Sequence, residues 1–78
     1  MKCRIINNSH DKLKMFQVNE ITVLLLWKDH PMWSERSSRQ KDILTICRQD
    51  LNQSGNFLTR EQFKDLLRNN YIELIYED

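Results

Sequence analysis

Apolar and polar residues alternate at both ends of the chain, with the period of two that is typical of β-strands. Residues 2–7 predict a first strand, and the Asn- and Ser-rich segment 7–11 after it predicts a turn. Residues 13–18 are a second β-prone run, so the two runs together predict a hairpin. Residues 71–76 alternate again, and we expect this last strand to lie beside the hairpin.

Two segments in the middle of the chain have the pattern of helices. Asn19 is a suitable N-cap, and the residues after it are apolar on most sides, which indicates a buried helix that ends before Pro31. A fully buried strand over residues 21–27 is the competing prediction, because periodicity does not separate the two. Over residues 39–51, apolar side chains recur at helical spacing, and a capping box begins just before them at Ser37. This pattern predicts a second helix.

A third helix is predicted over residues 60–69. Thr59 and Gln62 have the spacing of a capping box, and two consecutive asparagines at 69–70 form a stop signal. The expected fold is therefore a small single α+β domain over residues 1–78, with the order β-β-α-α-α-β. Three helices would pack on a short two- or three-stranded antiparallel sheet.

Charge and composition narrow the classes of function. The chain has 12 Lys and Arg against 11 Asp and Glu, which gives a net charge of +1. So small a charge does not attract the chain to nucleic acid or to anionic membranes. The longest apolar run, Val23–Trp27, is far too short to span a bilayer, and no signal peptide is visible. Cys3 and Cys47 are too few for a disulfide framework, so we expect a cytoplasmic protein with two buried thiols, and a single bridge between them is the alternative. We expect no cofactor, because the soft ligands Cys3, His10, His30 and Cys47 do not have the spacing of a zinc site.

One segment resembles the calcium loop of an EF-hand. The order of oxygen-bearing residues, the glycine and the closing glutamate match that motif at Asp50, Asn52, Ser54, Gly55 and Glu61. The resemblance implies a calcium site at residues 50–61 held by Asp50, Asn52, Ser54 and Glu61. A helix that begins at Thr59 argues against it, because Thr59 is then loop position nine, which places Gln62 at position twelve and Leu51 at position one. Gln62 has no carboxylate to close the site, and Leu51 cannot bind a metal. The preferred prediction is a turn with no metal, and a degenerate calcium site is the second alternative.

Four basic residues define the alternative of a nucleic-acid-binding regulator. On the predicted helix at 36–48 they are Arg36, Arg39, Lys41 and Arg48, as a helix-turn-helix or winged-helix protein would need in the major groove. Glu35 and Asp42 dilute the patch, and mixed charges are typical of a solvated helix face.

The leading hypothesis is a non-enzymatic protein–protein interaction module. The chain has no nucleophile motif and no phosphate-binding glycine loop, so we predict that it is not an enzyme. Tryptophan and methionine are enriched in interfaces, and the expected partner-binding residues are Trp27, His30, Met32 and Trp33. A small regulator, inhibitor, adaptor or assembly subunit of phage type fits this description. Self-association through a sheet edge is a further alternative.

Overall fold

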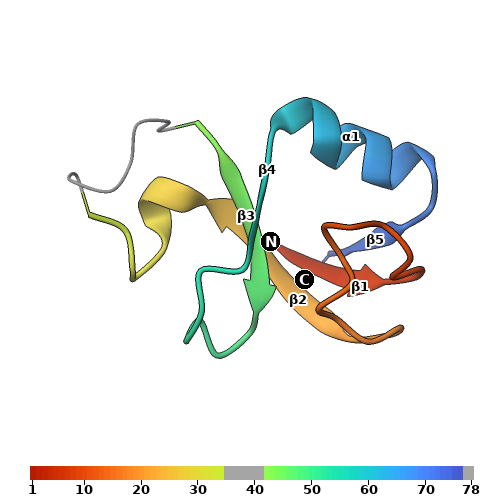
Figure 1. Cartoon of the computed structure of the whole chain (residues 1–78), viewed down its shortest axis with the longest axis horizontal. Helices are drawn as coiled ribbons and strands as arrows, with labels where there is room; N and C mark the ends of the chain where they lie inside the picture. The colour runs from red at the N-terminus through yellow and green to blue at the C-terminus, as the bar shows by residue number, and fades with distance from the viewer. Residues whose placement is uncertain (35–41, 77–78) are drawn as a thin grey trace.

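The computed structural model describes residues 1–34 and 42–76, which form an antiparallel sheet with an α-helix on one side (Figure 1). Its elements in chain order are β1 (Lys2–Ile5), β2 (Ile21–Leu26), the 3-10 helix η1 (Trp27–Asp29), β3 (Leu44–Arg48), β4 (Asn56–Leu58), α1 (Arg60–Arg68) and β5 (Ile72–Ile75). The strands lie in the order β4-β3-β2-β1-β5. The first four strands form a meander, and α1 carries the chain back to the opposite edge, where β5 pairs with β1.

The predicted arrangement of three helices on a two- or three-stranded sheet is wrong. The described residues contain five strands and one α-helix, although the fold is still a small α+β one. The first strand, the helix after Thr59 and the last strand are confirmed, and the last strand does pair with the first.

Alternation along the strands divides the side chains of the sheet between two faces. The face under α1 carries the main core, which includes Cys3, Ile5, Leu24, Ile46, Leu58 and Ile72. On the opposite face, Thr45 and Cys47 are also fully buried. Because β3 buries residues on both of its faces, the turns that flank it must form a second, smaller layer over the sheet.

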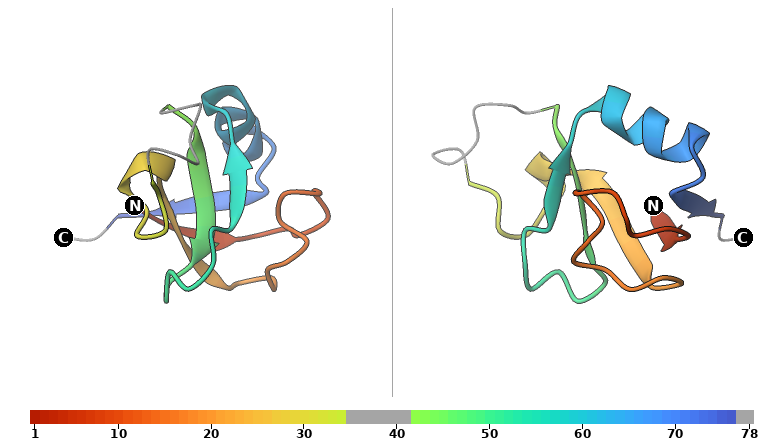
Figure 2. Two further views of the ribbon diagram at one scale, coloured as in Figure 1. Left: turned by 60° about the vertical axis from the view of Figure 1, so that its left-hand side comes forward. Right: turned by 45° about the vertical axis from the view of Figure 1, so that its right-hand side comes forward.

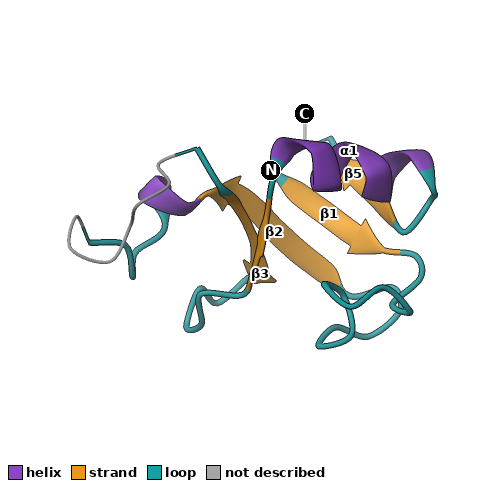
Figure 3. Cartoon of the chain, turned by 45° about the horizontal axis from the view of Figure 1, so that its top comes forward, coloured by secondary structure: helices purple, strands orange, loops and turns teal. Residues whose placement is uncertain are grey.

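The ends of α1 are fixed by local hydrogen bonds. The Thr59 hydroxyl accepts from the Gln62 N–H at 3.1 Å, and the Gln62 side chain accepts from the Thr59 N–H at 3.0 Å, so the predicted capping box is confirmed. After the helix, Asn70 has a φ of 60°, a left-handed conformation that asparagine tolerates. Figure 3 shows the helix lying across one side of the sheet, between β4 and β5 in the chain.

Replacing Thr59 with alanine is expected to lower the free energy of unfolding by about 0.5–2 kcal/mol, because the Gln62 N–H loses its acceptor at the helix start. Urea denaturation followed by circular dichroism measures the change. Thr59→Ser keeps the hydroxyl and is the control. A serine variant as unstable as the alanine variant would contradict a capping role for this side chain.

Residues 6–20 form a looped segment of turns rather than the second strand of the predicted hairpin (Figure 2). Leu13 and Phe16 are buried in the main core, and the Phe16 N–H donates to the Leu13 carbonyl at 3.0 Å. Two apolar residues three positions apart therefore point the same way within a turn. The strand predicted at 13–18 is wrong because this spacing, and not strict alternation, places the apolar side chains in the core.

The segment after Asn19 is a strand, not the preferred helix. β2 pairs with β1 on one edge and β3 on the other, so it is the central strand of the sheet. Asn19 is no N-cap: its φ of 71° places it in a left-handed turn before the strand. The competing prediction of a buried strand at 21–27 is confirmed. A central strand covered on both faces has no polar side, which gives it the same composition as a buried helix.

The helix predicted over 39–51 is also wrong, since Leu44–Arg48 is β3. Leu44 and Ile46 lie on the face under α1, whereas Thr45 and Cys47 lie on the other face. Both faces are covered, which hides the alternation from a hydrophobicity pattern. The capping box predicted from Ser37 lies outside the described residues.

Candidate functional site

Two of the four predicted partner-binding residues lie in the interior of the protein. Trp27 is 8% exposed and His30 is 3% exposed. The Trp27 ring lies against His30 at an interplanar angle of 40° and meets Phe57 edge-on, with ring centroids 5.1 Å apart in both pairs. Trp27 and His30 therefore build the second layer of the sheet, and neither presents its ring to a partner.

The other two residues of this turn are nearer to the surface. Met32 is 54% exposed, and its backbone N–H donates to His30 Nδ1 at 3.0 Å. Trp33 is half-buried, and its indole Nε1 is buried without a hydrogen-bond partner among the described residues. Of the predicted set, Met32 is thus the side chain most available for contact, in a position fixed by His30.

The basic residues predicted for nucleic-acid binding do not share a described helix. Arg36, Arg39 and Lys41 lie outside the described residues, and Arg48 ends β3.

Arg48 has a local structural role. Its Nε lies 3.3 Å from Glu20 Oε2, and its Nη2 donates to the Met15 carbonyl at 2.7 Å. Its guanidinium also lies over the Phe16 ring, 5.8 Å from the centroid. These contacts fasten the 6–20 segment to the sheet. Arg48 therefore lies on a strand and not on the helix that was expected to carry it.

The segment that resembles a calcium loop, residues 50–61, begins in the turn after β3, contains β4 and ends in the first turn of α1. An EF-hand needs a helix on each side of an irregular loop, whereas here a strand precedes the segment and a second strand lies within it. Asp50 Oδ1 accepts from the Asn52 N–H at 3.1 Å, which is a local Asx turn. In residues 1–34 and 42–76, no group of three or more His, Cys, Asp or Glu side chains is placed to hold a metal ion.

The two thiols are buried on opposite faces of the sheet. Cys3 lies under α1, Cys47 lies on the far face, and both are free. Burial raises the pKa of Cys3 to about 11. Burial, with the nearby Asp50 carboxylate, also raises the pKa of Cys47. Because the thiolate is the reactive form, neither cysteine is suited to be a nucleophile near neutral pH.

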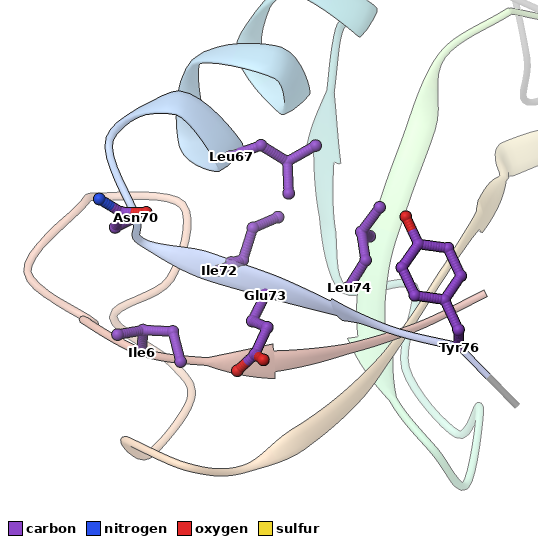
Figure 4. A pocket seen from close by; sticks show the side chains of 7 residues that line it. All are labelled: Ile6, Leu67, Asn70, Ile72, Glu73, Leu74 and Tyr76. Atoms are coloured by element: carbon purple, nitrogen blue, oxygen red, sulfur yellow. The ribbon is translucent and has the colours of Figure 1, made fainter.

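The outer edge of β5 is a candidate interaction surface. No described strand pairs with this edge, since β5 is last in the sheet order. Beside it lies a hollow of about 850 Å³. The hollow is lined by Ile6, Leu67, Asn70, Ile72, Glu73, Leu74 and Tyr76 (Figure 4).

The side chains that β5 contributes to this hollow point alternately to the two faces of the sheet. Figure 4 shows Ile72 and Leu74 pointing from β5 toward α1, where Leu67 meets them, whereas Glu73 points to the opposite side. Tyr76 stands at one end and is 84% exposed. Glu73 Oε2 lies 3.7 Å from Arg4 Nη1, so the acidic residue of the edge has a basic neighbour on β1. The edge of β5 is therefore apolar on the face toward α1, and on the opposite face it carries the ion pair between Glu73 and Arg4.

The sequence predicted the terminal strand but did not identify these residues as a site. Comparison of the chain with protein-family models, with curated protein sequences and with solved structures found no match. In the described part of the chain, no helix has the length and apolar character needed to cross a bilayer. Any assignment of function thus depends on the geometry of the surface.

Proposed function

We propose that this protein is a non-enzymatic interaction module that binds a strand of a partner protein along the outer edge of β5. The observation that carries the proposal is an edge strand whose outer side has no described partner, beside an apolar hollow. Addition of an extended segment to a sheet edge is a common mode of recognition, in which backbone hydrogen bonds give affinity and side-chain pockets give specificity. A small regulator, inhibitor, adaptor or assembly subunit could act in this way.

The backbone of β5 offers hydrogen bonds on its outer side. The Ile6 N–H donates to the Tyr71 carbonyl at 2.9 Å, at the start of the β1–β5 ladder. The alternation of antiparallel hydrogen bonds then turns the backbone groups of Glu73 toward β1 and those of Ile72 and Leu74 outward. A partner strand would therefore find its donors and acceptors at residues 72 and 74.

The side chains specify what kind of strand fits. Partner residues on the helix side of the sheet would contact Ile72, Leu74 and Leu67, which favours apolar side chains two positions apart. The residues between them would lie beside Glu73, where Arg4 already balances the charge. Charged side chains commonly protect sheet edges from pairing, and this edge has one such charge with a cation beside it.

The proposal is tested by capturing the partner and then locating the contact. A photo-reactive amino acid at position 76 would cross-link the partner in the native host, because Tyr76 is exposed at the end of the hollow. In the purified complex, amide exchange at Ile72 and Leu74 should slow. A complex that leaves these two amides unchanged would contradict strand addition. If slower exchange appeared at Met32 and Trp33 instead, the turn predicted from the sequence would be the interface.

Replacing Leu74 with lysine is expected to weaken binding of the captured partner at least about tenfold, since it places a charge on the apolar side of the edge. Isothermal titration calorimetry measures the affinity. Val18→Lys is the matched control, because Val18 is an exposed apolar residue outside the hollow. Equal losses in the two variants would mean that the contact does not depend on β5.

A further inference from the structure

The face of the sheet under α1 is not covered evenly. The segment with Leu13 and Phe16 packs on one part of the core, and Leu66 of α1 packs on another. Where β2 and β3 reach Leu26 and Leu44, a hollow of about 410 Å³ remains between the sheet and the start of α1. It is lined by Met1, Leu24, Leu25, Leu26, Leu44, Arg60, Phe63 and Lys64.

The charged residues of this hollow are both basic. Arg60 and Lys64 are four residues apart in α1 and therefore lie on the same face of the helix. Neither forms an ion pair with a residue in the described ranges, whereas Arg68 of the same helix lies 3.7 Å from Asp65. No described acidic residue lines the hollow. The site thus has an apolar floor and a positive rim without a counter-charge.

We infer that this hollow binds a small amphiphile, an apolar chain that ends in a carboxylate. The chain would lie on Leu26, Leu44 and Phe63, and the carboxylate would lie beside Arg60 and Lys64. The volume is in the range of small-ligand sites, which are typically apolar with a few polar groups that fix orientation.

The backbone favours a small ligand over a peptide strand. β3 is paired on both of its edges here, because Leu44 lies between Leu26 of β2 and Leu58 of β4. On the β1 side, β2 extends past Met1 only by Leu25 and Leu26, which is too short a stretch to pair with a strand. The hollow shares no lining residue with the one beside β5, and the inference is independent of strand addition.

The test is a titration with decanoate, decanol and decyltrimethylammonium, each below its micelle concentration, followed by methyl NMR. The three probes share a chain and differ in the head group. Decanoate is expected to shift the methyl signals of Leu26 and Leu44 and to bind most tightly, with the cationic probe weakest. Equal affinity for all three probes, or no shift at these leucines, would overturn the inference.

Two charge-matched double variants separate recognition from general electrostatics. Arg60→Gln with Lys64→Gln should weaken decanoate binding roughly tenfold and leave decanol binding unchanged. Lys14→Gln with Arg68→Gln removes the same charge at exposed sites outside the hollow and should leave decanoate binding within about twofold. If both double variants lost decanoate affinity equally, the two rim residues would have no specific role.

Discussion

Replacing Gly55 with alanine is expected to lower the free energy of unfolding by about 3–5 kcal/mol, from left-handed strain and overpacking together. Gly55 has a φ of +72°, which side chains adopt only at a cost. An added Cβ would lie 2.1 Å from the Ile46 carbonyl oxygen and 2.6 Å from Cys47 Cβ. Both neighbours belong to β3 and are fully buried, so the strand has no room to move away.

This loss would be a large part of the total stability, which for a chain of this size is on the order of 4–12 kcal/mol. The melting temperature should fall by roughly 12 °C or more. Calorimetry and urea denaturation measure both quantities. Gln53→Ala is the control, because Gln53 is exposed in the same turn and only its carbonyl is used. A Gly55→Ala variant within about 1 kcal/mol of the wild type would contradict the close approach of this turn to β3.

The parts of the fold that could be predicted from the sequence are those with local signals. The helix start depends on Thr59 and Gln62, which lie three residues apart and bond to each other. Its end depends on Asn69 and Asn70, the second of which adopts the left-handed conformation. Residues 71–76 show alternation because β5 buries Ile72 on one face and exposes Glu73 on the other. In each case the residues that determine the structure are neighbours in the chain.

The central strands could not be predicted because their environment is set by distant residues. In β3, Ile46 is covered from the helix side, while Thr45 is covered by the turn at 49–55. The Thr45 hydroxyl donates to the Ser54 carbonyl, so a polar side chain is buried opposite an apolar one. Burial on both faces makes period two invisible, and the remaining pattern matched a helix by coincidence.

The candidate surfaces likewise depend on contacts between residues that are distant in the sequence. Trp27 and Met32 are close in sequence and equally typical of an interface, yet Trp27 is buried against Phe57 and Met32 is exposed. The edge of β5 is a surface because α1 returns the chain to the far side of β1, which no local pattern indicates. The pairing of Arg4 with Glu73 likewise depends on the β1–β5 register.

Replacing His30 with alanine is expected to lower the free energy of unfolding by about 2–4 kcal/mol. Nδ1 accepts from the Met32 N–H, so the proton is on Nε2, which donates to the Gln53 carbonyl at 3.0 Å. One buried ring thus joins the turn at 27–33 to the turn at 49–55. Alanine would leave a cavity beside Trp27 and both backbone groups without their partner.

Urea denaturation measures this change, and tryptophan fluorescence reports on the turn itself, since both tryptophans lie within three residues of position 30. His10→Ala is the control: His10 is half-buried, accepts from the Lys12 N–H at 3.1 Å and meets Tyr71 edge-on. We expect it to cost about 1 kcal/mol and to leave the emission unchanged. Because His30 accepts a hydrogen bond from the Met32 N–H, its loss should also make the exposed part of this turn at Met32 more mobile. Equal losses for the two histidines, with no red shift in emission, would mean that His30 does not join the two turns.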